Sequence, residues 1–269
     1  MKKNIFFVIL ITAISVAWNY ASKEKVTVWL IGDSTVDDGS GNNDLWGWGK
    51  FFPQFFDTTK ITVRNYAQGG TSARTFQTNG IWDKRINKRG MWDTVYSKLK
   101  KNDFLIIQFG LNDQGRIDDS SRARGTLRGI GEDSVQIFNV VTKKLETVHT
   151  FGWYMRRFIR LAKSKGVNVI VCSSVPKNEW KAGKLIRNEF GFCEWAINVA
   201  KQEGSYYIDL NSMIADVYDK EGQTAVTQKY HIVKDHVHTI TAGAVLNASL
   251  VAKGIKGLKN CNLKNYLKK

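Results

Sequence analysis

The sequence predicts an α/β domain in which helices cover both faces of a parallel sheet. Short, continuous runs of strand-forming apolar residues recur along the chain, as buried parallel strands require. Stretches with helical spacing of apolar residues separate these runs, and this alternation is typical of a parallel sheet. The chain has 269 residues, of which 43% are hydrophobic, enough to build one large core.

The expected strands are short apolar runs with turn residues at their ends. They lie at residues 26–31, 61–66, 104–109, 167–175 and 206–210. The expected helices lie at residues 47–56, 92–100, 151–166, 189–204 and 241–257. Pro53 limits the regularity of the first of these helices, because it cannot donate a backbone hydrogen bond.

Two long polar stretches interrupt the alternation of strands and helices. Residues 111–150 follow the third expected strand, and residues 222–238 precede the last expected helix. Long loops in a compact domain are usually functional or disordered. Both leave the sheet on its carboxyl side, where open α/β sheets bind ligands. We therefore expect the functional site at that edge of the sheet.

The first residues have the layout of a secretory signal peptide. Lys2 and Lys3 precede an apolar stretch over residues 5–18, after which the sequence becomes polar. The stretch is too short to span a bilayer comfortably. We expect a signal peptide over residues 1–22, with its cleavage site left open, and an uncleaved anchor as the alternative. The mature protein is then expected to be secreted or periplasmic, without stable membrane association.

After this segment we expect one domain over residues 23–258 and a basic C-terminal tail over residues 259–269. The three cysteines do not make the disulfide framework of an exported protein. Cys172 lies in an expected strand and is expected to be buried. A bridge between Cys193 and Cys261 stays open at this stage.

The net charge of +16 favours polyanionic partners through long-range attraction. Export argues against nucleic acid, so we expect an acidic polysaccharide or an anionic cell surface instead. The alternative is a lysine-rich surface with no particular partner. We expect a monomer that binds no nucleic acid.

A serine directly follows the first expected strand, in the stretch "VTVWLIGDST". Gly32 ends the strand in a tight turn, which places Ser34 at the carboxyl edge of the sheet. The alternative role for Ser34 is a cap on the next element. As a nucleophile it would need a base to remove its proton, and the base would need a group that fixes its tautomer.

The stretch "YHIVKDHVHT" before the last helix contains three of the four histidines. Asp235 and His238 stand three residues apart there, so a turn can fold the carboxylate onto the imidazole and supply base and orienter together. The competing interpretation is a metal site formed by His231, Asp235, His236 and His238. No further ligand-spaced cluster accompanies it, so we expect no metal and no other cofactor.

Two further loops offer donors for a developing oxyanion. Gly69 and Gly70 follow the second strand in "NYAQGGTSAR", where a backbone N–H can approach a ligand closely. Asn112 follows the third strand in "QFGLND" and offers a side-chain amide. With the N–H of Ser34 they would make a three-donor oxyanion hole. The alternatives are an ordinary turn glycine and a loop-capping amide.

In combination these segments resemble the four blocks of the SGNH (GDSL) hydrolases. The blocks are Gly32-Asp33-Ser34, Gly70, Gly110-x-Asn112-Asp113 and Asp235-x-x-His238. Within the superfamily the sequence is most similar to the rhamnogalacturonan acetylesterase-like carbohydrate esterases, through segments such as "GWG", "GGTSAR" and "DHVHTITAGA". The G-x-S-x-G elbow of the α/β-hydrolases is absent around Ser34.

The resemblance implies a three-layer α/β/α sandwich with a parallel, flavodoxin-like sheet. It implies Ser34 as nucleophile, His238 as base and Asp235 as orienter, with Ser34, Gly70 and Asn112 as the oxyanion hole. Many relatives carry histidine at the position before the third-block asparagine, where this chain has leucine, so substrate contacts are expected to differ.

The expected activity is a serine esterase that removes acetyl groups from a plant cell-wall polysaccharide, and the resemblance favours a pectic one such as rhamnogalacturonan. The alternatives are an acetylxylan esterase, a general small-ester esterase or lipase, and a non-enzymatic carbohydrate-binding module. Further candidates for substrate contact are Asp33, Arg74, Asp113 and His236. Arginines that could pair with sugar carboxylates are Arg74, Arg116, Arg122, Arg124 and Arg128.

A binding module would use tryptophans as sugar-stacking faces. The candidates are Trp46, Trp48, Trp82, Trp92, Trp153, Trp180 and Trp195. Among these, helical spacing predicts core positions for Trp92, Trp153 and Trp195.

Overall fold

The computed structural model describes residues 25–39, 44–78, 91–187 and 190–268. The expected signal peptide lies outside the described residues, and so does Trp82. In the part of the chain that is described, no helix combines the length and the apolar character needed to cross a membrane.

The described residues form a five-stranded parallel sheet with the strand order β2-β1-β3-β6-β9. The strands are β1 (Val26–Gly32), β2 (Ile61–Asn65), β3 (Phe104–Gln108), β6 (Asn168–Cys172) and β9 (Tyr206–Ile208). Each falls within or next to one of the five predicted apolar runs. The order is that of a flavodoxin-like sheet, with the first strand inside and the second at the edge, so the predicted fold class is confirmed.

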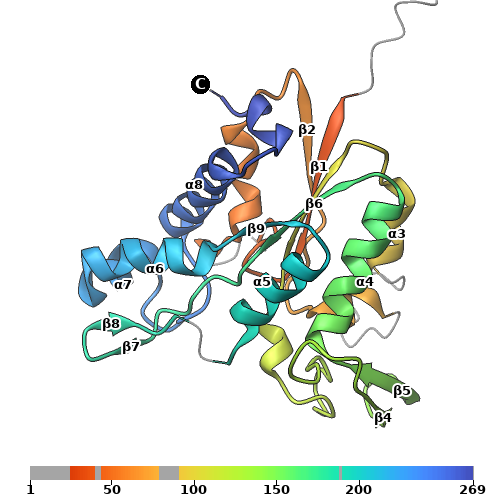
Figure 1. Cartoon of the computed structure of the whole chain (residues 1–269). Helices are drawn as coiled ribbons and strands as arrows, with labels where there is room; N and C mark the ends of the chain where they lie inside the picture. Colours follow the sequence, from red (N-terminus) through yellow and green to blue (C-terminus); the bar gives the residue numbers. More distant parts are fainter. Residues whose placement is uncertain (1–24, 40–43, 79–90, 188–189, 269) are drawn as a thin grey trace, which may run out of the picture.

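Helices cover both faces of this sheet and make it the middle of three layers (Figure 1). Along β1 the buried side chains alternate between the faces, as the pleat of a strand requires. Val28 and Leu30 join one hydrophobic cluster, whereas Trp29 and Ile31 join the other.

The helices divide between these two clusters. The cluster that contains Trp29 includes residues of α2 (Ala73–Gln77), α3 (Met91–Lys98), α4 (Phe151–Ser164) and α5 (Phe192–Gln202). The cluster that contains Val28 includes residues of η2 (Trp48–Lys50), η3 (Phe52–Phe55), α6 (Leu210–Glu221), α7 (Gln223–Tyr230) and α8 (Thr241–Gly257). The apolar stretch with Pro53 is thus two short 3-10 helices, because proline at the start of η3 prevents one continuous α-helix.

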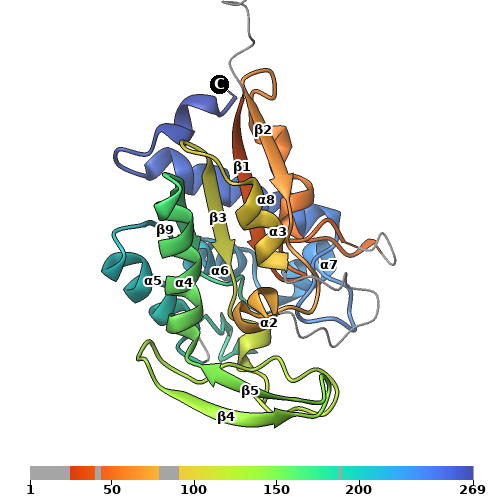
Figure 2. The same ribbon diagram turned by 90° about the vertical axis from the view of Figure 1, so that its right-hand side faces the viewer.

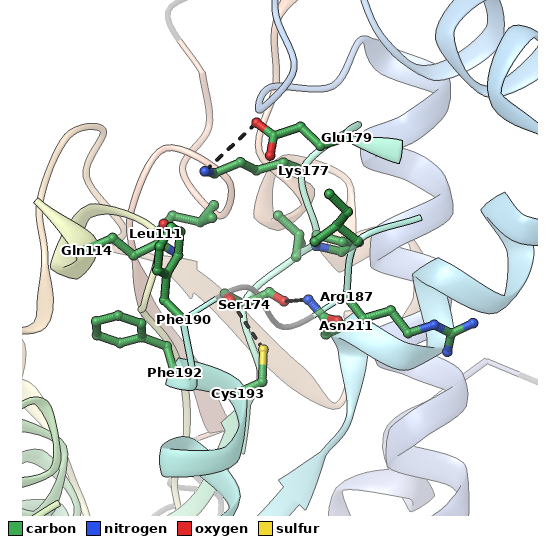
Figure 3. Close-up of a pocket in the computed structure, with 13 residues that line it drawn as sticks. Leu111, Gln114, Ser174, Lys177, Glu179, Arg187, Phe190, Phe192, Cys193 and Asn211 are labelled. Atoms are coloured by element: carbon green, nitrogen blue, oxygen red, sulfur yellow. Dashed lines mark hydrogen bonds and ion pairs between the residues drawn. The ribbon is translucent and has the colours of Figure 1, made fainter. Parts of the chain in front are cut away.

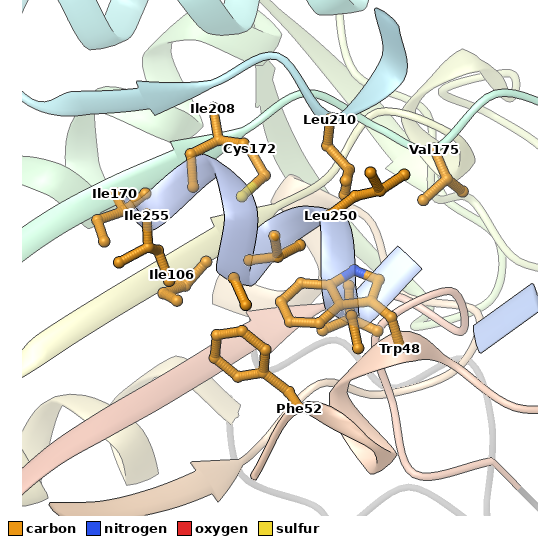
Figure 4. Packing of buried hydrophobic residues seen from close by; sticks show 14 of the residues in the cluster. Trp48, Phe52, Ile106, Ile170, Cys172, Val175, Ile208, Leu210, Leu250 and Ile255 are labelled. Carbon is orange, nitrogen blue, oxygen red and sulfur yellow. The ribbon is translucent and has the colours of Figure 1, made fainter. Parts of the chain in front are cut away.

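Trp48 packs in the cluster that contains Val28, with Phe52 beside it and Leu250 of α8 close by (Figure 4). Its indole N–H donates to Oε1 of Gln108 at 2.8 Å. The amide nitrogen of Gln108 in turn donates to the hydroxyl of Thr35 at 2.7 Å. Trp48 therefore belongs to the core and has no exposed face for stacking on a sugar. Trp92 is also buried, as predicted, and Trp153 and Trp195 pack partly buried against the other cluster.

Two stretches that we expected to be loops contain regular structure. Residues 111–150 include η4 (Asn112–Gln114) and an antiparallel hairpin of β4 (Ser134–Asn139) and β5 (Lys144–His149). Figure 2 shows this hairpin lying across the end of the molecule toward which β2 and β3 point. Residues 222–238 include α7, and a second small hairpin, β7 (Trp180–Lys181) with β8 (Lys184–Leu185), follows β6.

The C-terminal residues pack against the domain. They form η5 (Asn262–Tyr266), and Cys261 and Leu263 are buried in the cluster around Trp48. The backbone N–H of Lys268 donates to the carbonyl of Phe55 at 2.9 Å. All three cysteines lie in the described part of the chain and none forms a disulfide, so Cys193 and Cys261 are not bridged.

Candidate active site

Ser34 lies in a tight turn at the carboxyl end of β1. The carboxylate of Asp33 accepts hydrogen bonds from the backbone N–H and the hydroxyl of Thr35, at 2.9 and 2.7 Å, and these bonds hold the turn. Gly32 is required just before it, because a Cβ there would lie 2.7 Å from the carbonyl oxygen of Gln108. The turn leaves the side chain of Ser34 only partly buried at the edge of the sheet.

His238 and Asp235 complete a chain of hydrogen bonds that starts at Ser34. The Nε2 atom of His238 lies 2.9 Å from the Oγ atom of Ser34, although the two residues are 204 positions apart in the sequence. The Nδ1 atom of His238 lies 2.8 Å from Oδ2 of Asp235. With the carboxylate accepting at Nδ1, the tautomer that leaves Nε2 able to accept the serine proton is favoured.

A local turn fixes the carboxylate of Asp235. Its Oδ1 atom accepts from the backbone N–H groups of Val237 and His238, both at 2.8 Å. Partial burial raises the pKa of Asp235, but the hydrogen bonds from His238 and Val237 outweigh it and hold the pKa below its usual range. The carboxylate therefore stays charged and can stabilise an imidazolium.

The loop that carries His238 is anchored on both sides. Nδ1 of His231 lies 3.0 Å from the carbonyl oxygen of His238, and its Nε2 lies 3.2 Å from the hydroxyl of Tyr218. Burial lowers the pKa of His231 and favours its neutral form. Trp46 pairs with Thr239 through its backbone. Sequence reasoning did not assign a role to Tyr218 or to this use of His231.

The two loops proposed for the oxyanion hole lie against this chain of hydrogen bonds. Gly70 adopts φ +80°, a conformation that glycine reaches without strain. A Cβ on Gly69 would lie 3.6 Å from the Cβ of Ser34, so this turn sits next to the serine. The side-chain nitrogen of Asn112 donates to the carbonyl of Thr71 at 2.8 Å, which brings the amide beside the same turn.

The buried carboxyl group of Asp113 connects these two loops through hydrogen bonds. Its carboxylate accepts from the backbone N–H of Ala73 through Oδ1 and from that of Gly110 through Oδ2, each at 3.0 Å. Burial, opposed by these hydrogen bonds and reinforced by the charge of Asp33, raises the pKa of Asp113 to about 8. Burial also raises the pKa of Asp33, whose Oδ2 finds no hydrogen-bond partner among the described residues.

Three of the four residues expected to contact substrate are buried instead. Asp33 and Asp113 are each 1% exposed and Arg74 is 0% exposed. The expectation was wrong for Arg74, because a buried guanidinium needs its own partners and here finds them in the protein. It binds both carboxylate oxygens of Glu146, at 2.7 and 2.6 Å, and the carbonyls of Ile117 and Gly125.

Asp113 accepts from backbone N–H groups through both oxygens, and Asp33 accepts from the N–H and hydroxyl of Thr35 through Oδ1. Both carboxyl groups therefore act as structural acceptors. His236, the fourth candidate, is exposed on the loop that carries His238. Its carbonyl accepts from the backbone N–H of Asn178 at 2.7 Å.

The remaining arginines are distributed around the same edge. Arg116 pairs with Asp118 at the surface, and Arg122 is exposed. Arg124 is partly buried and donates to the carbonyl of Gly70 at 3.4 Å. Arg128 lies with its guanidinium carbon 5.5 Å from the ring centroid of Phe190.

The side chains of the competing metal interpretation do not converge on one point. Nowhere in the described ranges do three or more His, Cys, Asp or Glu side chains gather in an arrangement that could hold a metal ion. His231 turns toward Tyr218, whereas His238 turns toward Asp235 and Ser34.

The sequence matches a known protein family. Residues 30–244 match the model of the GDSL-like Lipase/Acylhydrolase family. The chain belongs to this family. The match begins within β1 and ends within α8, so it includes Ser34, Asn112 and His238. The resemblance predicted from the four sequence blocks is confirmed.

Several proteins are similar to this family member over most of its length. A rhamnogalacturonan acetylesterase of Emericella nidulans is 28% identical over 230 residues, which cover 85% of this chain and 84% of the relative. The rhamnogalacturonan acetylesterase RhgT of Bacillus subtilis is 26% identical over 259 residues, covering 91% of this chain and 95% of the relative.

Solved structures share the fold. The structure of YxiM from Bacillus subtilis superposes with a TM-score of 0.67 at 23% identity and covers 87% of this chain, which spans 56% of that protein's chain. Axe2, an acetylxylan esterase of Geobacillus stearothermophilus, gives a TM-score of 0.56 at 16% identity, covering 87% of this chain and 95% of its own.

Proposed function

We propose that this family member is a serine esterase that removes acetyl groups from a polysaccharide. The proposal rests on the chain of hydrogen bonds that runs from Ser34 through His238 to Asp235. Nε2 of His238 lies 2.9 Å from Ser34 Oγ, and its Nδ1 lies 2.8 Å from Asp235 Oδ2. Such a chain of hydrogen bonds gives a serine hydroxyl the base it needs and holds that base in one tautomer. The relatives named rhamnogalacturonan acetylesterases support the acyl group and the substrate class.

The proposed mechanism assigns one step to each of these groups. Ser34 Oγ attacks the ester carbonyl while His238 Nε2 takes its proton, and Asp235 stabilises the resulting imidazolium. The tetrahedral oxyanion accepts hydrogen bonds from the N–H groups of Ser34 and Gly70 and from the amide of Asn112. His238 then protonates the departing sugar oxygen, and the C–O bond breaks to leave an acetyl-serine.

Water completes the cycle by the same route. His238 removes a proton from a water molecule, which attacks the acetyl-serine carbonyl and forms a second tetrahedral intermediate. Its collapse releases acetate and returns the proton to Ser34 Oγ. No step needs a metal ion, so a chelator should leave the rate of acetate release unchanged; loss of activity that added metal restores would contradict this mechanism.

For the substrate we propose an acetylated pectic polysaccharide. Two relatives named for rhamnogalacturonan support it, as does the net charge of +16, which suits a polyanionic chain. The layout of residues 1–22 supports export to the compartment where such polymers occur. The mass of the mature protein after expression in an exporting host would test this: the loss of about the first 22 residues is expected, whereas retention of the full chain contradicts it.

The substrate proposal is tested by acetate release from three substrates measured side by side. These are an acetylated rhamnogalacturonan, an acetylated xylan and a small chromogenic acetate ester. The proposal predicts the highest kcat/KM on the pectic polymer. A higher kcat/KM on xylan would overturn the proposal of a pectic substrate. No turnover on any of the three substrates would overturn the proposal of esterase activity.

A further inference from the structure

The last residue of β3 is a buried side-chain amide. Gln108 is fully buried at the end of a strand whose other four residues are apolar. In the sheet it stands opposite Gly32 of β1, two residues before Ser34. A buried amide lowers the free energy of unfolding unless hydrogen bonds replace those that it made with water. An amide at this position therefore needs partners within the protein.

Trp48 fixes the orientation of this amide. An indole N–H can only donate a hydrogen bond, and that of Trp48 donates to Oε1 of Gln108 at 2.8 Å. Nε2 of Gln108 is thereby turned toward the hydroxyl of Thr35, to which it donates at 2.7 Å. Trp48 and Thr35 are both buried, so water does not compete for these hydrogen bonds and the amide keeps one orientation.

Thr35 is peptide-bonded to Ser34 and is held through each of its polar groups. Its carbonyl accepts from the backbone N–H of Trp48 at 2.9 Å. Its N–H and its hydroxyl both donate to Oδ1 of Asp33, at 2.9 and 2.7 Å. Because a hydroxyl carries one proton, which here goes to Asp33, the hydroxyl can only accept from Gln108. The hydrogen bonds thus run in one direction, from the indole to the carboxylate.

The loop that continues from Gln108 is supported by packing on its other side. In the sheet, β3 lies between β1 and β6. Toward β6, a Cβ on Gly110 would lie 3.4 Å from the Cβ of Ser174. Figure 3 shows Leu111 and Ser174 among the residues that line a small pocket on that side. Toward β1 the contact is polar, because the Gln108 amide joins the end of β3 to the turn that carries the nucleophile.

We infer that Gln108 is a positioning residue, which sets the place of the Ser34 turn through Thr35. The inference rests on the proposed esterase function and adds the groups that hold its nucleophile. Two groups of the turn act in the reaction: Ser34 Oγ, which must face His238, and the Ser34 N–H, which must face the oxyanion. A shift of about 1 Å in such groups can lower a rate about 10²-fold. Because neither group binds the ester before attack, the loss is expected in kcat and not in KM.

Gln108→Met tests this inference, because methionine is flexible enough to fill the same space and cannot replace the two hydrogen bonds. On the chromogenic acetate ester, kcat should fall by about 10- to 100-fold, while KM stays within about twofold of the wild-type value. Gln77→Met is the matched control. Gln77 is also buried, and its Nε2 donates to the carbonyl of Tyr154 in α4 at 2.7 Å. Its loss should lower the melting temperature to a similar extent and leave kcat unchanged.

Thr35 provides a second test that does not depend on the folding of Gln108→Met. Thr35→Val removes the hydroxyl and should lower kcat to a similar extent. Thr35→Ser keeps the hydroxyl and should recover most of that loss. In the double variant of Gln108→Met and Thr35→Val the two losses should not multiply, because both changes break the same hydrogen bond.

Four results would overturn the role of Gln108. They are equal changes of kcat in Gln108→Met and Gln77→Met, a rise in KM with unchanged kcat, losses that multiply in the double variant, and no recovery in Thr35→Ser. Failure of the esterase proposal is distinct, because the wild-type protein would then not hydrolyse the chromogenic ester.

Discussion

Asp113 shows how a single buried carboxyl group can serve a site without touching substrate. It is 1% exposed, and its two oxygens accept the N–H groups of Ala73 and Gly110. These donors belong to the loops that carry Gly70 and Asn112. The group thus positions two parts of the proposed oxyanion hole relative to each other.

The raised pKa of Asp113, about 8 against an ordinary 3.8, predicts a dependence of stability on pH. Between these values the folded protein binds a proton that the unfolded chain has lost, so the free energy of unfolding falls as pH rises toward 8. Urea unfolding at a series of pH values measures this. In Asp113→Asn, which cannot ionise, the fall should be smaller; an equal or steeper fall would contradict the assignment.

Asn112 permits a second prediction at the scale of one side chain. Asn112→Ala removes one donor from the proposed oxyanion hole and should lower kcat by about 10²–10³, with a smaller effect on KM, because the oxyanion exists only after attack. Steady-state hydrolysis of the chromogenic ester measures both constants. Asn262→Ala, an exposed change in η5, is the control, and comparable rates in the two variants would argue against the role of Asn112.

Among the elements, the β4–β5 hairpin is held by one buried ion pair. Glu146 in β5 binds the guanidinium of Arg74 in α2, which is fully buried, and also accepts from Asn139 in β4. Arg74 additionally binds the carbonyls of Ile117 and Gly125. Helix α2, the β4–β5 hairpin and the connecting loop therefore meet at one guanidinium.

Removal of one partner from this pair should be costly. Glu146→Ala leaves the buried charge of Arg74 without its carboxylate, and we expect the free energy of unfolding to fall by about 3 kcal/mol. Thermal or urea unfolding measures the loss. Asp118→Ala, which breaks the exposed pair with Arg116, should leave the unfolding midpoint in place. Equal losses of unfolding free energy in the two variants would show that the Arg74–Glu146 pair stabilises the fold no more than an exposed pair does.

The same hairpin shows why part of the fold escaped prediction. Its inward face carries Asn139 and Glu146, whereas Phe138 and Leu145 are 55% and 66% exposed on the outward face. Val148, which shares the inward face with Glu146, is fully buried. Both faces therefore mix apolar and polar side chains, and no clean alternation of the kind that predicts a strand was visible. In α7 only Val226 and Tyr230 are buried, too few to give a helical pattern.

The parallel strands and the last helix were predictable because they follow ordinary patterns. The strands of the sheet are continuous apolar runs, and α8 spans residues 241–257 as predicted. The grouping of Ser34, Asp235 and His238 was predictable from the sequence. Ser34 directly follows a strand, and Asp235 and His238 stand three residues apart. Burial of Arg74 was not predictable, because its partner Glu146 lies 72 residues away in an unpredicted hairpin.

At the scale of the whole molecule, the charge of +16 should act on a polymer and not on a small neutral ester. Raising ionic strength from about 0.01 to 0.15 M shortens the screening length from about 30 to 8 Å. KM for acetylated rhamnogalacturonan should then rise several-fold, whereas KM for the chromogenic ester should stay constant. The same salt effect on both substrates would show that the charge has no part in binding.

The arrangement of the sheet explains how distant segments meet. The carboxyl ends of β1, β2 and β3 deliver Ser34, Gly70 and Asn112 to one edge. The loop before α8 returns to that edge and adds Asp235 and His238, held there through Trp46 and Thr239. The fold accordingly brings five residues from four loops to one edge of the sheet.

The most direct test is the turnover of Ser34→Ala on the chromogenic acetate ester, with Ser134→Ala in the exposed hairpin strand as the matched control. With the far-UV spectrum and melting temperature unchanged, Ser34→Ala should lose about four orders of magnitude or more in kcat, and Ser134→Ala should keep wild-type activity. A correctly folded Ser34→Ala protein that still hydrolyses the ester at the wild-type rate would contradict the account.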